Sequence, residues 1–185
     1  MKCHPYWRTG TVGEMQILAI NEKTVPLGSG QHATLRTLTL QNHAEPFSSL
    51  REITQVHYED WPDFGTPTEA RAIINVVSLL NDLTSPHNNL KSAERNSPVV
   101  VHCSAGCGRT GTFCTVDSII DYLSERGATG DDEEDLVFRT VSRMREQRMS
   151  LVQTLRQYVL CYDCILYYLV GEMGDEELQV DAWGR

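Results

Sequence analysis

Residues 98–111 read Pro-Val-Val-Val-His-Cys-Ser-Ala-Gly-Cys-Gly-Arg-Thr-Gly. The apolar run at 98–102 predicts a short buried strand of the parallel-sheet kind. A glycine-rich turn follows, and the next helix has an apolar face formed by Phe113, Val116, Ile120 and Leu123. A strand that leads through such a turn into a helix is where α/β proteins bind ligands. This stretch therefore predicts an α/β fold with a ligand site at residues 102–111.

The remaining elements extend this prediction to a twisted mixed sheet flanked by helices. Partly alternating stretches at 14–20, 33–41 and 51–58 predict antiparallel strands, with a turn at residues 28–30. The stretch Thr66-Pro67-Thr68-Glu69 predicts a capped helix start, and that helix runs to about Leu83. Further helices are predicted over 136–147 and 154–170. The last of these carries an apolar stripe that we expect to be buried, namely Leu155, Val159, Tyr162, Leu166 and Leu169.

Composition excludes several classes of protein. The chain has 185 residues, of which 22% are charged, so it is neither collagen-like nor disordered. A net charge of −9 and only three lysines argue against nucleic acid as a partner. The N-terminus lacks a secretory apolar stretch, and the longest apolar tract, Val159 to Val170, is too short to span a bilayer. We expect a cytoplasmic monomer, with no membrane span, whose six cysteines are reduced thiols.

The residues that carry chemistry surround Cys103 and Arg109. A bare Cys-x5-Arg pair would occur about 0.4 times by chance, but the added requirement of His102, Gly106 and Gly108 lowers this to roughly 10⁻⁴. Glycines let a loop turn successive backbone N–H groups inward as an anion-binding nest. Such a nest stabilises a thiolate and binds phosphate oxygens. The planar guanidinium of Arg109 can donate two parallel hydrogen bonds to two of those oxygens.

These residues resemble the signature loop of the cysteine-dependent protein tyrosine phosphatases. Three more segments resemble that family in the same order: the segment at 2–7 (KCHPYW), the general-acid loop at 61–67 (WPDFGTP) and the glutamine loop at 153–157 (QTLRQ). The last two are typical of the phosphotyrosine-specific branch. The resemblance implies a phosphatase fold, with a catalytic domain over 1–171 and an acidic C-terminal tail over 172–185.

The implied activity is two-step hydrolysis of phosphotyrosine in proteins, in signal transduction. Cys103 attacks phosphorus to give a cysteinyl-phosphate, while Asp63 protonates the leaving tyrosyl oxygen. Asp63 then activates a water positioned by Gln153, with Gln157 assisting. We expect no metal and no cofactor, because the nest and the guanidinium supply the positive field.

Other residues receive supporting roles from the resemblance. Thr110 eases departure of the thiolate, and His102 tunes it from outside the pocket. Trp61 and Pro67 frame the hinges of the acid loop. The implied substrate-binding residues are Ser104, Ala105, Gly106, Cys107, Gly108, Arg109, Asp63, Phe64, Gln153 and Gln157. The implied partners are phosphotyrosine-containing proteins.

The resemblance begins part-way into the family's domain. The helices, strands, tyrosine-bearing loop and arginine-bracing glutamate that normally precede its first segment have no counterpart before Lys2. We therefore expect a partial, N-terminally truncated domain. Without central strands, Val99–Val101 should have unpaired backbone groups and exposed apolar faces.

Alternative interpretations remain open at this stage. One is a binding module, a catalytically weak fragment that holds phosphotyrosine peptides. Another is a redox protein using Cys103 and Cys107, although Cys107 fits better as a small hydrophobe on the inner side of the loop. The Cys161-x2-Cys164 pair favours core packing over zinc, because it lacks a second ligand pair. The acidic run at 130–135 favours a solvated loop before a helix.

Overall fold

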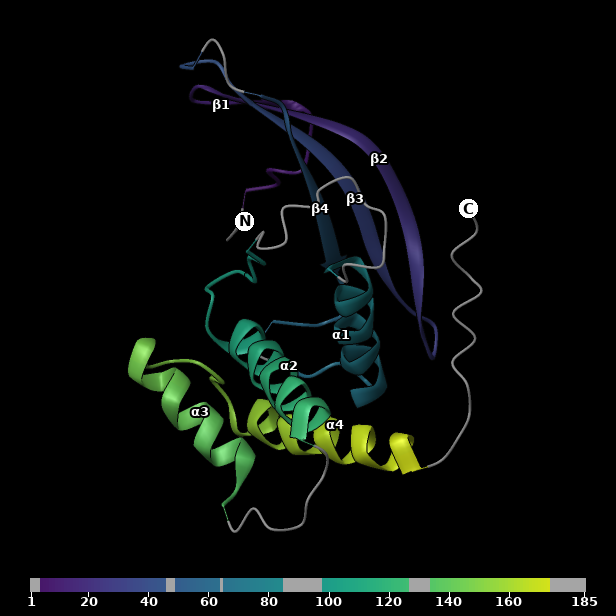
Figure 1. The fold of residues 1–185 in the computed structure, drawn as a ribbon. Coiled ribbons are helices and arrows are strands. Elements are labelled where there is room, and N and C mark those ends of the chain that lie inside the picture. Colours follow the sequence, from purple (N-terminus) through teal and green to yellow (C-terminus); the bar gives the residue numbers. More distant parts are fainter. Residues whose placement is uncertain (1–3, 46–48, 64, 85–97, 127–133, 174–185) are drawn as a thin grey trace.

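The computed structural model describes residues 4–45, 49–63, 65–84, 98–126 and 134–173. A four-stranded antiparallel sheet lies at one end of the molecule, and the helices pack at the other (Figure 1). Each strand pairs with its neighbour in sequence, in the order β1 (Gly10–Val12), β2 (Met15–Gly28), β3 (Gln31–Asn42) and β4 (Arg51–Tyr58). The predicted α/β class, with helices packed on a sheet, is confirmed, but the described sheet is antiparallel throughout rather than mixed.

The long hairpin of β2 and β3 turns where the sequence predicts it. Residues 28, 29 and 30 all have positive φ angles, of 83°, 51° and 74°. Glycine occupies two of these positions, because it adopts this conformation without steric cost. The paired strands are longer than the predicted 14–20 and 33–41, whereas β4 has the predicted bounds. The three-residue β1 was not predicted.

Helix α1 (Ala70–Thr84) packs against the end of the sheet that carries the β2–β3 turn (Figure 1), and it starts later than predicted. Its residues Ala72, Val76 and Leu79 pack on buried side chains of β2 and β3. The predicted capping box at 66–69 is wrong, because α1 begins only at Ala70 and Thr66 is therefore not its N-cap. The carboxylate of Glu69 instead accepts a hydrogen bond from Ser29 Oγ in the hairpin turn.

The other three helices enclose the main hydrophobic core. They are α2 (Gly108–Arg126), α3 (Leu136–Gln147), with its predicted bounds, and α4 (Leu155–Met173). Their buried side chains meet those of α1 and the ring of Trp61 in one cluster, which includes Ile73, Val77, Val116, Ile119, Val141 and Leu160. Within the described residues, none of the helices combines the length and apolarity needed to span a membrane.

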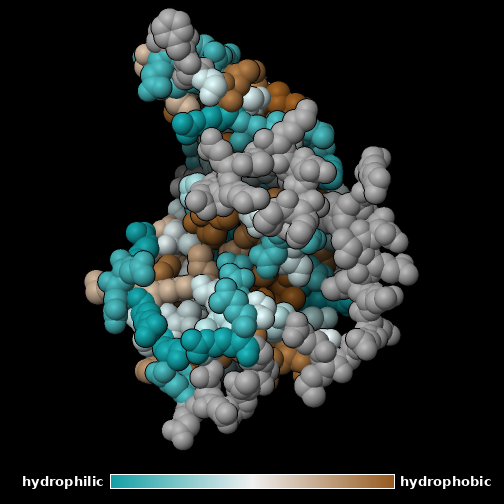
Figure 2. All heavy atoms as spheres, viewed as in Figure 1, coloured by the Kyte–Doolittle hydropathy of each residue, from teal (hydrophilic) through white to brown (hydrophobic). Residues whose placement is uncertain are grey.

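The strand predicted over 98–102 does not form. These residues have no strand partner in the described structure, and Val99 and Val100 are 50% and 81% exposed. A run of valines becomes a buried parallel strand only where neighbouring strands pair with it, and in the described sheet β4 pairs with β3 alone. The exposed apolar faces expected here are present for both valines. Figure 2 shows hydrophobic residues at the surface between the sheet and the helices.

The predicted buried stripe of α4 is also wrong for most of its members. Leu155 and Leu166 are 77% and 60% exposed, and the residues that enter the core are Leu160, Cys161, Cys164 and Ile165. Apolar residues occur on more than one face of α4, so contacts with α1 and α2 decide which face is buried. Core packing of the Cys161/Cys164 pair is thereby confirmed, and burial raises the pKa of Cys161 to about 12.

Part of the acidic run acts at the start of α3, as expected. Asp135 is the N-cap, and its carboxylate accepts a hydrogen bond from the Phe138 N–H at 2.9 Å. Glu134 pairs with Arg139 at 3.1 Å. Residues 130–133 of the run, and 174–185 of the predicted tail, lie outside the described residues.

Candidate active site

The loop at 103–107 surrounds the sulfur of Cys103 with hydrogen-bond donors at the start of α2. The Gly106 N–H donates to Sγ at 3.2 Å, and Gly106 has a φ of 67°, which glycine tolerates best. Burial alone would raise the pKa of the thiol. The hydroxyl and N–H of Thr110, with the N–H groups of Ala105 and Cys107, outweigh burial and lower the pKa of Cys103 from 9.0 to about 6. At neutral pH the sulfur is therefore mainly a thiolate.

Arg109 joins this loop to the Trp61–Asp63 segment. Its guanidinium donates to the carbonyl oxygen of Trp61 at 2.9 Å and to Oγ of Ser104 at 3.0 Å. It also forms an ion pair with Asp63, with 2.6 Å between Nη2 and Oδ1. The same Asp63 oxygen accepts a hydrogen bond from Ser104 Oγ at 2.9 Å. The structure thus brings together Arg109, Asp63 and Ser104, the residue directly after Cys103 in the chain, whereas Phe64 lies outside the described residues.

The acid loop is held by a buried tryptophan and a tight turn. Trp61 is 5% exposed, and its indole N–H donates to the Gly65 carbonyl oxygen at 3.1 Å. The Gly65 N–H donates in turn to the Pro62 carbonyl oxygen at 3.2 Å. A Cβ on Gly65 would lie only 2.8 Å from Cγ of Pro62. These contacts shape the loop on both sides of Asp63.

The two glutamines of the 153–157 segment have different surroundings. Gln157 is 1% exposed, and its Oε1 accepts hydrogen bonds from the N–H groups of Gln153 and Thr154 at 3.1 and 3.3 Å. Its Nε2 donates to the Gly65 carbonyl oxygen at 3.4 Å. Because the Gln157 N–H also donates to Thr154 Oγ1, this segment forms a capping box at the start of α4. Gln157 thus links α4 to the acid loop, whereas Gln153 is exposed to solvent.

Two arginines at the end of α3, which the sequence analysis missed, bind backbone carbonyl groups of the signature loop and of the segment before α4. Arg148 donates to the Ala105 carbonyl oxygen at 3.0 Å. Arg145 donates to the carbonyl oxygens of Leu151 and Val152 at 2.9 and 2.8 Å. The only feature of the sequence that could have pointed to Arg145 and Arg148 is their position just before the glutamine segment.

The segment between α3 and α4 lies directly against the first turns of α2. The Val152 N–H donates to the Cys107 carbonyl oxygen at 3.3 Å, and Val152 has a φ of 56°, which is strained for a β-branched residue. A Cβ on Gly111 would lie 2.4 Å from the Val152 nitrogen. The glycine at 111 therefore permits this close backbone approach.

His102 connects the signature loop to the N-terminal segment. Its Nε2 lies 2.6 Å from the Tyr6 hydroxyl, and its Nδ1 lies 3.2 Å from the Cys103 carbonyl oxygen. Gln55 on β4 also donates to the Tyr6 hydroxyl, at 3.0 Å. Tyr6 thus ties His102 to the sheet, while Lys2 and Cys3 of the same segment lie outside the described residues.

Comparison with known proteins agrees with this geometry. Residues 1–167 match the family model for protein-tyrosine phosphatase. The chain belongs to this family. A crystal structure of the catalytic domain of human protein tyrosine phosphatase non-receptor type 18 has a TM-score of 0.73 and 32% sequence identity to it. The phosphatase fold expected from the sequence is therefore confirmed.

Several curated members of the protein-tyrosine phosphatase family resemble the chain along most of its length. Tyrosine-protein phosphatase non-receptor type 9 of Mus musculus is 34% identical over 176 residues, covering 92% of this chain and 28% of that protein. Tyrosine-protein phosphatase corkscrew of Drosophila melanogaster is 34% identical over 173 residues, covering 91% and 19%. The chain also spans 55% of the human catalytic domain structure. It therefore matches only part of each relative.

Proposed function

We propose that this protein-tyrosine phosphatase chain hydrolyses phosphotyrosine in proteins through a cysteinyl-phosphate intermediate. The observation that carries the proposal is the lowered pKa of Cys103, about 6, in a loop whose next residue, Ser104, is bound by the guanidinium of Arg109. A thiolate in a nest of N–H donors can act as the nucleophile, and the same nest holds the anion that it attacks close to the sulfur. The names of the relatives support phosphotyrosine as the substrate class.

In the first step the Cys103 sulfur attacks phosphorus, and the bond from phosphorus to the tyrosyl oxygen breaks. The phosphate takes over the donors of Arg109 and Ser104 that Asp63 now occupies, which releases the Asp63 carboxyl group. Beside the dianion and away from the cation, that carboxyl group holds a proton more readily. It gives this proton to the departing oxygen, since a phenolate with a conjugate-acid pKa near 10 leaves poorly without one.

In the second step a water attacks the phosphorus of the cysteinyl-phosphate while Asp63 takes a proton from the water. The bond between sulfur and phosphorus breaks, which releases inorganic phosphate and the Cys103 thiolate. Gln153, whose side chain is exposed, orients this water. Gln157 acts through the backbone, because its amide is bound to Gly65 and to the start of α4. The hydroxyl of Thr110 stabilises the returning thiolate, and His102 positions the Cys103 carbonyl. No step requires a metal or cofactor.

The proposal extends to the setting of this activity. Residues 1–171 act as one catalytic unit, in a cytoplasmic monomer that dephosphorylates signalling proteins, with Ser104 to Arg109 cradling the phosphate. The net charge of −9 supports proteins rather than nucleic acids as substrates. Size-exclusion chromatography with light scattering tests the monomer.

An aryl phosphate assay tests the activity. We expect wild type to turn over, and Cys103→Ser to lose turnover while its circular dichroism stays that of a folded chain. If wild type turns over the aryl phosphate no faster than a folded Cys103→Ser variant, the proposed enzymatic activity is overturned. In that case, retained affinity for a phosphotyrosine peptide would support the binding module instead.

A further inference from the structure

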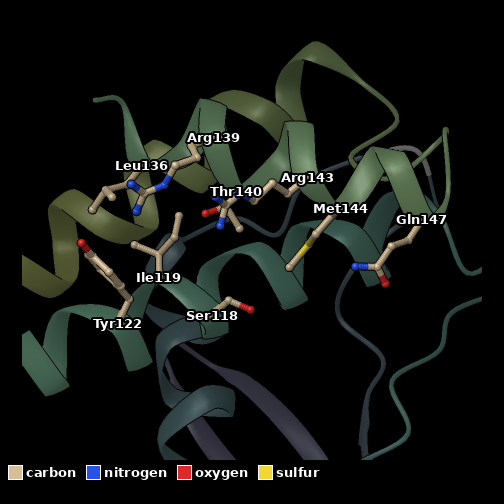
Figure 3. Close-up of a pocket in the computed structure, with 9 residues that line it drawn as sticks. All are labelled: Ser118, Ile119, Tyr122, Leu136, Arg139, Thr140, Arg143, Met144 and Gln147. Carbon is tan, nitrogen blue, oxygen red and sulfur yellow. The ribbon is translucent and has the colours of Figure 1, made fainter. Parts of the chain in front are cut away.

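A groove of about 260 Å³ lies between α2 and α3 (Figure 3). Ile119 and Tyr122 line it from α2, and Leu136, Arg139, Arg143 and Met144 line it from α3. Its lining on α2 begins at Ser118, ten residues beyond Gly108, or about 15 Å at 1.5 Å per residue, so none of its lining residues belongs to the signature loop. The proposed phosphatase chemistry does not use it.

The floor of the groove is apolar. Ile119 is 2% exposed and belongs to the main core, and Leu136 packs against the same core. The Thr115 hydroxyl donates to Sδ of Met144 at 3.6 Å, so this thioether is held between the two helices. An apolar side chain entering the groove would meet an anchored surface.

The rim of the groove is cationic. The guanidinium of Arg139 lies 5.3 Å from the centre of the Tyr122 ring, and that of Arg126 lies 5.0 Å from it. Figure 3 shows the Arg139 and Tyr122 side chains approaching each other across the groove. Arg143 is exposed, and no carboxylate of the described residues lies within 4.0 Å of its guanidinium. Two guanidinium groups thus lie over one ring, and a third, that of Arg143, lines the same groove, in a chain of net charge −9.

We propose that this groove binds an acidic peptide segment of a partner protein. One apolar side chain of the segment packs on the floor formed by Ile119, Leu136 and Met144. Carboxylates on either side of it pair with Arg143 and, in exchange for the exposed carboxylate of Glu134, with Arg139, because a guanidinium matches a carboxylate through two parallel hydrogen bonds. Duplex nucleic acid does not fit, since its phosphate backbone would be repelled by the acidic chain as a whole.

The groove is lined by α3, the helix whose C-terminal end contacts the signature loop. Arg139 and Arg143 belong to the same helix as Arg145, and Arg148 follows that helix directly. Those last two side chains hold the backbone of residues 105, 151 and 152. A partner in the groove therefore contacts the helix that positions the signature loop.

Fluorescence anisotropy of the full chain with a labelled peptide tests the groove. The probe is a seven-residue peptide of Asp and Glu around a single central Leu, and the comparison peptides replace Leu by Ser, or the acids by Asn and Gln. We expect Arg143→Glu to weaken binding about fivefold or more, since it reverses a charge that the peptide needs. Arg51→Glu, an equal charge change on exposed β4, should leave binding unchanged. Both comparison peptides should bind more weakly.

Two further variants keep the test sharp. Ser118→Trp fills the groove from α2 without a change of charge and should also abolish binding, with circular dichroism verifying the fold. Cys103→Ser should bind the peptide as wild type does. Equal losses in Arg143→Glu and Arg51→Glu would show a general charge effect and overturn the proposal. Displacement of the peptide by inorganic phosphate, or loss in Cys103→Ser, would place the peptide at the signature loop and overturn it as well.

Discussion

The Asp63 carboxylate lies 2.6 Å from the guanidinium of Arg109 and so occupies donors that the proposed mechanism assigns to the bound phosphate. The same carboxyl oxygen accepts the Ser104 hydroxyl. An anion entering the loop must therefore displace Asp63 before it can reach both donors. The general acid of the proposed mechanism and the substrate compete for one arginine.

Asp63→Asn is expected to separate binding from turnover. Neutral asparagine holds Arg109 less strongly, so orthovanadate should bind about three- to tenfold more tightly, as judged from charge-assisted hydrogen bonding. Turnover of an aryl phosphate should fall by about 10²–10⁴, because no acid protonates the leaving group. Inhibition by vanadate and steady-state kinetics measure the two effects. Asp60→Asn is the control, since Asp60 instead accepts the His32 N–H; unchanged vanadate affinity in Asp63→Asn would contradict the competition.

The Cys103 thiolate should appear as the pH rises through about 6. Its lowered pKa means that the ionised fraction grows from pH 5 to 7, well below the range of an ordinary thiol. Ultraviolet thiolate absorbance, taken as the difference between wild type and Cys103→Ser, follows this titration. Thr110→Val removes a hydroxyl that favours the thiolate and should raise the midpoint by up to about one pH unit. A midpoint near 8.5 in wild type would contradict the nest.

Gly111→Ala should destabilise the fold, whereas Gly171→Ala should not. At 111 the added methyl would lie 2.4 Å from the Val152 backbone nitrogen, so α2 and the 151–152 segment must separate, at a cost of about 2–3 kcal/mol. At 171, in the last turns of α4, nothing lies within 4 Å, and alanine should stabilise by about 0.5–1 kcal/mol. Urea unfolding measures both. Equal effects would show that the close approach at Gly111 does not matter.

Asp117 should make stability fall as the pH rises. Its Oδ1 is buried without a hydrogen-bond partner among the described residues, and burial, with a smaller effect of Asp121, raises its pKa from 3.8 to about 6. The folded state therefore favours the protonated acid, and this stabilisation, present below pH 4, is lost as the pH rises through 6. The shift would correspond to about 3 kcal/mol if undiscounted, and partial exposure reduces this to about 1 kcal/mol.

Asp117→Asn tests that linkage. From pH 4 to pH 7, the free energy of unfolding of wild type should fall by about 1 kcal/mol relative to that of the variant, because asparagine does not ionise. Chemical denaturation at both pH values measures the difference. Asp163→Asn, at an exposed position of α4, serves as the control. A difference between wild type and Asp117→Asn that is independent of pH would rule out the linkage.

The amino-acid sequence by itself determined the features that depend on neighbouring residues. The nest around Cys103 forms within one short loop, so the spacing of Cys103, Gly106 and Arg109 was enough to predict it. The hairpin turn at 28–30 and the bounds of α3 also follow from local turn and helix preferences. Local conformation is specified by steric and hydrogen-bonding choices a few residues apart.

Tertiary structure alone decided what each element touches. Valines at 99 and 100 stay exposed because a strand needs partner strands, and α4 buries Cys161 and Cys164 because α1 and α2 pack on that face. Glu69 binds the hairpin rather than its own helix, and Arg148 reaches the signature loop from the end of α3. Burial and long-range hydrogen bonds depend on partners far away in sequence, and the periodicity of one segment does not specify those partners.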